Sequence, residues 1–195
     1  MENLVTKPAP DFAAQAVMPD NTFRELKLSD YRGKYVILFF YPLDFTFVCP
    51  SEIIAFDKEL TQFTERNTVV IGVSVDSHFS HFAWKNTPRN KGGIGNVQFP
   101  LVADITKRIS TDYGVLLDSG VALRGLFLID KEGVVRHCIV NDLPLGRNVD
   151  EALRTVEALH HFEKHGEVCP ANWREGDEAM KPTAEGVATY LGKHG

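Results

Sequence analysis

The amino-acid sequence predicts an α/β fold, with a central mixed β-sheet flanked by helices, an N-terminal β-hairpin and a C-terminal arm. Short apolar runs alternate with segments of helical periodicity along the chain. The run over residues 36–41 is apolar without interruption, as in a strand that is buried on both faces. Hairpin signals stand near the start of the chain and after residue 120. The 195 residues, 44% of them hydrophobic, suit a single sizeable core.

Each predicted strand is a short apolar run bounded by turn signals. The strands are expected at residues 12–17, 22–28, 36–41, 69–75, 99–103, 122–129 and 134–140. The turn of the first hairpin is Met18-Pro-Asp-Asn21, and that of the last is Asp130-Lys-Glu-Gly133. Ser29-Asp30 is expected to cap a single helical turn before the third strand.

Helical periodicity follows several start signals. Proline is favoured at the first position of a helix, and from Pro50 the apolar residues recur at spacings of three and four. Asn148 is expected to cap a long helix that Gly166 closes, and a shorter helix ends at Gly114.

A further helix is expected after the second long apolar strand. Asp76-Ser77 supplies its cap, and the helix contains the aromatic residues Phe79, Phe82 and Trp84. The glycine-rich stretch that follows, residues 90–95, is expected to be a flexible loop.

The predicted domain organisation is one domain over residues 1–166 and a C-terminal arm over residues 167–195. Beyond residue 166 the apolar periodicity fades. Gly176, Pro182 and Gly186 interrupt that stretch, so we expect it to lie outside the core.

Composition and charge exclude several classes of function. The net charge of −5 shows no basic patch of the kind that binds nucleic acid. No apolar run approaches the roughly 20 residues of a membrane-spanning helix, and the N-terminus lacks the regions of a signal peptide. Three cysteines do not make a structural disulfide framework, so we expect a reducing, cytoplasmic setting in which any disulfide is transient.

Cys49 is the candidate reactive group of the chain. It stands directly before Pro50, at the expected start of a helix, where free backbone N–H groups and the helix dipole favour an anion. A thiol in that position loses its proton more readily, and the thiolate is the reactive form. The alternative is a small apolar residue that fills space, since unpaired cysteines are usually buried and inert. The nearby hydroxyl of Thr46 favours the reactive interpretation.

The pattern Pro42-x-x-x-Thr46-x-x-Cys49 resembles the active-site signature of the peroxiredoxins, and the surrounding Phe-Tyr-Pro-Leu-Asp-Phe-Thr-Phe-Val-Cys-Pro is close to their typical two-cysteine group. The likeness extends from about Lys7 into the C-terminal tail. It implies a thioredoxin-like fold in which Cys49 attacks the O–O bond of a hydroperoxide. Thr46-x-x-Cys49 stands where a thioredoxin carries its Cys-x-x-Cys pair.

The same resemblance assigns further site residues. Thr46, through its hydroxyl, and Arg124, through its guanidinium, would stabilise the charge that develops on the peroxide oxygens. Pro42 would shield the thiolate from water. Glu52 is either a helix-start acid that suits the dipole or the group that holds Arg124 and Arg147 in place.

Cys169, in His165-Gly-Glu-Val-Cys-Pro-Ala-Asn-Trp, resembles the resolving cysteine of the family, which forms a disulfide with the oxidised cysteine, usually of a second chain. Cys138 lies within a predicted strand and is expected to be structural. The resemblance further implies hydrogen peroxide and organic hydroperoxides as substrates, thioredoxin or a similar dithiol as reductant, and a homodimer that can form a ring of five dimers. No metal or organic cofactor is implied.

The histidines do not predict a metal site. Tetrahedral zinc sites show paired, tightly spaced ligands, whereas this chain has a cluster at one expected helix end, namely His160, His161, His165 and Cys169. Cations suit the C-termini of helices. His78 and His81 are expected to flank an ordinary amphipathic helix.

Two other functions stay open at this level. One is a thioredoxin-fold disulfide oxidoreductase, which the replacement of the partner cysteine by Thr46 disfavours. The other is a peroxide sensor or holdase chaperone. In over-oxidation-sensitive peroxiredoxins a Gly-Gly-Leu-Gly loop and a C-terminal Tyr-Phe helix slow resolution. Because this chain has Gly92-Gly93-Ile94-Gly95 and Tyr190-Leu191, intermediate sensitivity is expected.

Overall fold

A computed structural model describes residues 3–194 of the chain. It confirms the predicted α/β class: seven strands form one mixed sheet in the order β2-β1-β5-β4-β3-β6-β7. The strands are β1 (Ala13–Val17), β2 (Phe23–Lys27), β3 (Tyr35–Phe40), β4 (Thr68–Ser74), β5 (Leu101–Ala103), β6 (Arg124–Ile129) and β7 (Val135–Asn141). Each begins and ends within two residues of a run predicted from the sequence, and β5 and β6 begin two residues later than expected.

The helices follow the expected start signals. They are η1 (Leu28–Tyr31), α1 (Cys49–Lys58), α2 (Leu60–Glu65), α3 (His78–Lys85), η2 (Arg89–Lys91), α4 (Arg108–Asp112), α5 (Val149–His165) and α6 (Ala184–His194). The predicted cap of α3 is confirmed, since Ser77 Oγ accepts a hydrogen bond from Ser80 N at 3.2 Å. The expected helix from Pro50 is divided at Glu59 into α1 and α2.

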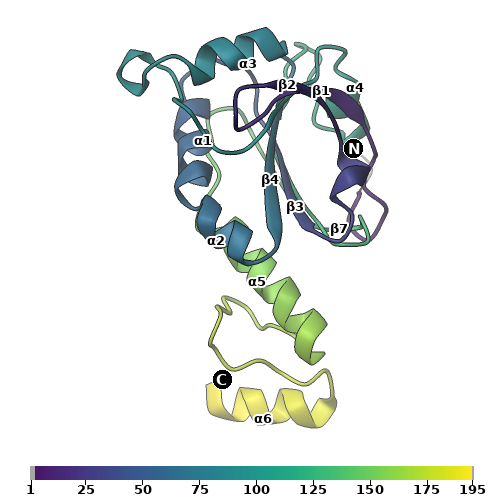
Figure 1. Ribbon diagram of the computed structural model, residues 1–195. Coiled ribbons are helices and arrows are strands. Elements are labelled where there is room, and N and C mark those ends of the chain that lie inside the picture. Colours follow the sequence, from purple (N-terminus) through teal and green to yellow (C-terminus); the bar gives the residue numbers. More distant parts are fainter. Residues whose placement is uncertain (1–2, 195) are drawn as a thin grey trace. The chain divides into compact units, whose positions relative to one another are not determined.

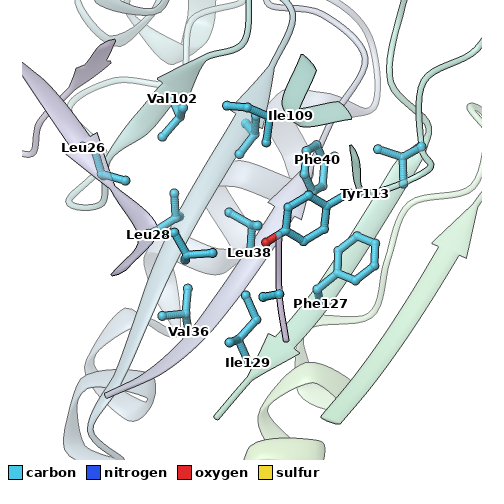
Figure 2. Packing of buried hydrophobic residues seen from close by; sticks show 14 of the residues in the cluster. Leu26, Leu28, Val36, Leu38, Phe40, Val102, Ile109, Tyr113, Phe127 and Ile129 are labelled. Carbon is cyan, nitrogen blue, oxygen red and sulfur yellow. The ribbon is translucent and has the colours of Figure 1, made fainter. Parts of the chain in front are cut away.

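Strand β3 lies inside the sheet, parallel to β4 and antiparallel to β6. All six of its residues are buried, as its uninterrupted apolar run predicted. Because side chains alternate along a strand, β3 serves two cores. On one face Phe40 packs against Tyr113 and Phe127, with ring centroids 5.2 and 5.8 Å away (Figure 2).

The opposite face of β3 receives the helix that begins at Cys49. Phe39 stacks on Phe56 of α1 at a centroid distance of 4.6 Å, and Phe56 in turn contacts Phe63 of α2. Figure 1 shows α1 and α2 on one side of β3 and β4, with α4 on the other. This aromatic packing fixes α1 against the sheet and so places its first turn.

The two ends of the sheet are the predicted hairpins. Among the residues that the structure describes, β2 pairs only with β1 at one end of the sheet. At the other end β7 pairs with β6, and its first residue, Val135, also exchanges backbone hydrogen bonds with Thr6 and Lys7. Strand β7 has exposed positions, and Ile139 is 38% exposed. A partly apolar edge strand of this kind is a template for pairing with another chain.

Helix α3 differs from the sequence expectation in which side it buries. Its buried residues are His81, Trp84 and Lys85, whereas Phe79 and Phe82 are 65% and 38% exposed. The helix therefore turns a histidine and a lysine inward and two phenylalanines outward. His78 and His81 were expected to flank this helix, but both lie within it, and His81 is buried.

Residues 90–95 also differ from the expected flexible loop. Ile94 is fully buried, and its carbonyl accepts a hydrogen bond from Arg89 Nε at 3.1 Å. Trp84 Nε1 donates to the carbonyl of Gly92 at 2.9 Å. A side chain on Gly93 would place its Cβ 1.8 Å from the carbonyl oxygen of Thr87, so the chain passes too close there for any other residue.

The chain divides into two compact units, Met1–Val149 and Asp150–Gly195. The second unit groups most of α5 with the C-terminal segment, whereas the sequence analysis divided the domain 1–166 from the arm 167–195. Residues 1–2, at the N-terminus examined for a signal peptide, and residue 195, at the end of the arm, lie outside the described residues. Helix α6, which the fading periodicity did not indicate, lies in this unit and buries none of its side chains.

Within residues 3–194 no helix has the length and apolar character needed to cross a membrane.

Candidate active site

Cys49 is the first residue of α1, and its side chain is fully buried. Pro50 occupies the first turn, as expected, because its missing N–H needs no partner there. The loop 41–48 brings the chain from the end of β3 to this turn. The thiol thus lies beside the N-terminal end of a helix, where the dipole favours negative charge.

Thr46 lies next to the thiol. Its Oγ1 is 2.9 Å from Cys49 Sγ and 2.8 Å from the carbonyl oxygen of Leu43. A hydroxyl has one hydrogen, so it donates to one of these atoms at a time. It can therefore donate to a thiolate or, when Cys49 carries the proton, accept from the thiol while donating to Leu43.

Arg124 reaches the thiol from the first residue of β6. Its Nη1 lies 3.4 Å from Cys49 Sγ, and its Nε donates to the carbonyl of Leu143 at 2.7 Å. The side chain is almost completely buried. Its place at the start of an apolar strand, taken without the family resemblance, would indicate only a strand-edge charge. The structure instead brings it together with Cys49 and Thr46.

Glu52, one turn after Cys49 on α1, joins two arginines. Its Oε2 accepts from Arg124 Nη1 at 2.6 Å, and its Oε1 accepts from the backbone N and the Nε of Arg147, both at 2.8 Å. This confirms the expectation that Glu52 contacts both side chains. Burial by itself raises the pKa of Glu52, but the hydrogen bonds and charge of Arg147 outweigh it, and the pKa lies below its ordinary value.

The charges of this cluster do not cancel. Glu52 contributes one negative charge and the two arginines contribute two positive charges, so one net positive charge lies beside the thiol. Arg147 is held by backbone as well, since its Nη1 donates to the carbonyl of Phe40 at 2.8 Å. A buried positive charge in this position stabilises negative charge that develops during a reaction at the sulfur.

Pro42 is buried directly after β3, at the start of the loop that leads to Cys49. Within the same loop Phe45 has a φ of 54°, in the left-handed region that a bulky residue rarely adopts. Such a conformation persists only where the surroundings hold it. The preceding residue, Asp44, is fixed by several buried hydrogen bonds.

Asp44 is the centre of a buried hydrogen-bond network that the sequence analysis missed. Its carboxylate accepts from Tyr41 Oη at 2.9 Å and Ser80 Oγ at 2.7 Å, and it lies 2.8 Å from His81 Nδ1. Its backbone N donates to Asp76 Oδ2 at 2.9 Å. The network ties the Cys49 loop to α3.

The ring of His81 contacts an oxygen atom on each side. Its Nε2 lies 3.1 Å from the carbonyl oxygen of Val102, and its Nδ1 lies 2.8 Å from the carboxylate of Asp44. The signal that could have indicated burial was the spacing of three residues between His81 and Trp84, which places them on one helix face.

Cys169 lies in the C-terminal unit. Its side chain is half-buried, and its Sγ lies 3.6 Å from the carbonyl oxygen of Ala158 on α5. Burial raises the pKa of the Cys169 thiol; the charge of Arg154 opposes the rise and that of Glu167 adds to it. Cys138 is half-buried on β7, as expected for a strand position.

No group of three or more His, Cys, Asp or Glu side chains in the described part of the chain is arranged to hold a metal ion. The histidines at the end of α5 serve other contacts: His161 pairs with Glu167 at 3.1 Å and packs on His165 and Trp173.

A buried thiol at a helix start, with a hydroxyl and a guanidinium aimed at its sulfur on a thioredoxin-like sheet, defines a cysteine-dependent oxidoreductase. The model of the AhpC/TSA family matches residues 5–138, and that of the C-terminal domain of 1-Cys peroxiredoxin matches residues 158–193.

Alkyl hydroperoxide reductase C of Helicobacter pylori is 65% identical over 190 residues, which are 96% of each chain. The crystal structure of reduced Plasmodium vivax 2-Cys peroxiredoxin is 57% identical and has a TM-score of 0.96, covering 98% of this chain and 100% of that one. Thioredoxin peroxidase I of Plasmodium yoelii is 59% identical with a TM-score of 0.80, covering 88% of this chain and 99% of that one.

The chain belongs to the AhpC/TSA family. It is a peroxiredoxin, an enzyme with thiol-dependent peroxidase activity.

Proposed function

We propose that the enzyme reduces hydrogen peroxide and organic hydroperoxides with Cys49 as the nucleophile. The thiolate attacks one peroxide oxygen, an S–O bond forms, and the O–O bond breaks. Cys49 becomes a sulfenic acid, and the second oxygen leaves as water or an alcohol after taking a proton. No further cofactor is needed, because the sulfur supplies the electrons.

The observation that carries this proposal is the convergence of two donors on one sulfur. Thr46 Oγ1 and Arg124 Nη1 lie 2.9 and 3.4 Å from Cys49 Sγ. A peroxide oxygen in contact with the sulfur would lie within reach of both donors. Preorganised donors of this kind stabilise the charge that develops as the O–O bond breaks. Pro42, buried at the start of the loop, would keep water from the thiolate.

The second half of the cycle is assigned to Cys169 of the partner subunit. Its sulfur attacks the sulfenic sulfur of Cys49, which releases water and leaves an intersubunit disulfide. A dithiol, most simply thioredoxin, then reduces this disulfide. The name of the Plasmodium yoelii relative, a thioredoxin peroxidase, supports this choice of reductant.

We further propose that the enzyme is a homodimer that can assemble into a ring of five dimers. Two surfaces of the first unit support self-association. One is the edge strand β7 with its exposed Ile139. The other is an aromatic cluster of Phe23, His78, Phe79 and Phe82, in which the ring of Phe23 lies 4.9 to 5.6 Å from the other three. Exposed apolar clusters mark interaction sites.

Peroxide consumption with and without thioredoxin tests the cycle. Wild type should turn over only with thioredoxin, and peroxide-treated enzyme should run as a covalent dimer on a non-reducing gel. Cys169→Ser should be oxidised once and then stop. A covalent bridge within a single chain would contradict the intersubunit disulfide, and continued turnover by Cys169→Ser would remove Cys169 from the cycle.

The size of the assembly and the location of the enzyme have separate tests. Phe79→Asp places a charge in the aromatic cluster and should reduce the mass measured by light scattering to that of a dimer. Few cysteines and transient disulfides support a cytoplasmic location, and fractionation of cells would test it.

A further inference from the structure

The C-terminal unit holds the segment around Cys169 on one face of α5. Cys169 Sγ approaches the carbonyl of Ala158, and Trp173, four residues further on, is buried with its Nε1 donating to the carbonyl of Asp177 at 3.1 Å. The ring of His161 packs on that of Trp173 at 5.0 Å. The thiol is therefore presented by a docked segment.

Arg154 lies one helical turn before Ala158, so its side chain shares the face of α5 on which Cys169 rests. Its Nε and Nη2 form two hydrogen bonds with the carboxylate of Glu151, at 2.6 and 2.7 Å. Its remaining terminal nitrogen, Nη1, donates to the carbonyl of Trp173 at 3.3 Å. The rigid fork of the guanidinium thus ties the helix to the end of the Cys169 segment.

We propose that Arg154 is a positioning residue for the resolving step, which holds the Cys169 segment on α5 and keeps a positive charge on the helix face where the thiol lies. The proposal rests on the proposed function of Cys169 as the resolving cysteine. It assigns a role to a side chain outside the Cys49 site.

The charged groups around Cys169 influence the ionisation of its thiol. Two charged groups act on the thiol, a positive one from Arg154 on α5 and a negative one from Glu167 on the segment itself. His161 pairs with Glu167, while Glu151 and Glu157 act on Arg154. Burial raises the pKa of Cys169 and Arg154 opposes that rise, so the loss of Arg154 leaves the thiol harder to ionise.

The chemistry of resolution requires that ionisation. The thiolate of Cys169 attacks the sulfenic sulfur, an S–S bond forms, and the S–O bond breaks. The hydroxide that leaves takes up the proton lost by the thiol, so one water is produced and both sulfurs end in a disulfide. Because the attacking species is the thiolate, the rate follows its fraction.

The experiment measures the ionisation of Cys169 separately from catalysis. In a Cys49→Ser/Cys138→Ser background Cys169 is the remaining cysteine of three, so the pH dependence of alkylation by iodoacetamide reports its thiolate. Arg154→Gln should move the midpoint upward by about half a pH unit and slow alkylation at pH 7 about threefold. The shift is modest because the Arg154 side chain is 24% exposed and water screens it.

Matched variants separate charge from structure. Arg154→Lys keeps the charge and should stay near the wild-type midpoint, and Arg174→Gln, which removes an exposed arginine of the same unit, should have no effect. If Arg154 were only a structural tie, Arg154→Gln would release the segment, expose the thiol and move the midpoint down. That result, or an unchanged midpoint, would overturn the proposal.

The wild-type cysteine background then connects ionisation to resolution. After one equivalent of peroxide, the rate of disulfide formation in Arg154→Gln should show the same upward shift in its pH profile, with an unchanged rate of Cys49 oxidation. A shifted alkylation midpoint with an unshifted resolution profile would overturn the role in resolution. Absence of any Cys49–Cys169 disulfide in the wild type would instead show that the proposed cycle itself is wrong.

Discussion

The two cysteines of the proposed cycle differ in burial, in their position relative to a helix and in the hydrogen-bond partners of the sulfur. Cys49 is fully buried at a helix start, between the Thr46 hydroxyl and the Arg124 guanidinium. Cys169 is half-buried beside a helix, with its sulfur near the carbonyl of Ala158. One sulfur faces hydrogen-bond donors, and the other faces an acceptor.

This difference separates two chemical tasks. A sulfur that faces donors is prepared to carry negative charge and to share its donors with a peroxide. A sulfur that faces a carbonyl is held as a protonated thiol, and the raised pKa of Cys169 agrees with that state. In the proposed cycle the first cysteine reacts with peroxide, and the second reacts only after a sulfenic acid has formed.

The largest effect is expected at the sulfur of Cys49 itself. Cys49→Ser should abolish peroxide reduction, because a serine hydroxyl is not oxidised by peroxide in this way. Cys138→Ser is the matched control: its thiol lies on β7, and its loss should leave turnover nearly unchanged. Steady-state peroxide consumption with thioredoxin measures both variants. Substantial turnover by Cys49→Ser would show that Cys49 is not the residue that peroxide oxidises.

The second-largest effect is expected when Arg124, a hydrogen-bond donor to the sulfur of Cys49, is removed. Arg124→Ala removes a buried guanidinium that contacts Cys49 Sγ, and it should slow the oxidation step roughly a hundredfold or more. Arg136→Ala, on the neighbouring strand β7, removes a part-exposed arginine paired with Asp130 and should leave that step unchanged. Stopped-flow mixing with peroxide would show the difference, and a rate within a few-fold of wild type would remove Arg124 from the site.

Glu52 offers a test of what holds the Cys49 surroundings together. Glu52→Gln would leave Arg124 and Arg147 buried without their carboxylate, which should lower the free energy of unfolding at pH 7 by roughly 3–5 kcal/mol. Glu25→Gln, which removes an exposed partner of Lys27, should change stability little.

The pH dependence of this effect has a definite sign. The pKa of Glu52 is lowered in the folded protein, so its stabilisation is fully present above the ordinary value of 4.5. It is lost as the pH falls through the lower folded-state pKa. Denaturant unfolding at a series of pH values should therefore show wild type and Glu52→Gln converging at acidic pH. A difference that stayed constant would contradict the charged state assigned to Glu52.

The Cys49 surroundings were largely predictable from the sequence because their signals are local. An apolar run, a helix-start proline and Thr46 three residues before Cys49 stand within one short stretch. Arg124 lies 75 residues away, and only the family resemblance indicated its place. His81 joins Asp44 across 37 residues, and the pattern of α3 concealed it because two phenylalanines are exposed on the other face.

The C-terminal unit was less predictable for a physical reason. Helix α6 buries no side chain, so its sequence needs no apolar stripe, and Gly186 and Gly192 lower its helix propensity further. Arg154 and Trp173 meet through a backbone carbonyl, which leaves no trace in residue types. Contacts of that kind require coordinates.

The smallest effect is expected at the C-terminal helix, and it concerns over-oxidation. A sulfenic acid either forms the disulfide or reacts with a second peroxide to give the sulfinic acid. Because Cys49 is fully buried in the first turn of α1, we expect the proposed disulfide to need local unwinding of that turn, and a helix packed over it would favour the second route. Leu191 of α6 is 56% exposed and lacks the aromatic area of a phenylalanine.

Leu191→Phe should therefore lower, within a few-fold, the peroxide concentration that inactivates the enzyme during turnover, and deletion of residues 186–195 should raise it. Leu191→Met, which keeps an apolar chain without a ring, should match the wild type. Mass spectrometry of Cys49 during turnover with thioredoxin measures the sulfinic acid directly. Equal sulfinate yields in the wild type and the deletion variant would show that α6 does not slow resolution. The sensitivity of Cys49 to over-oxidation would then depend on how readily the Cys169 segment leaves α5.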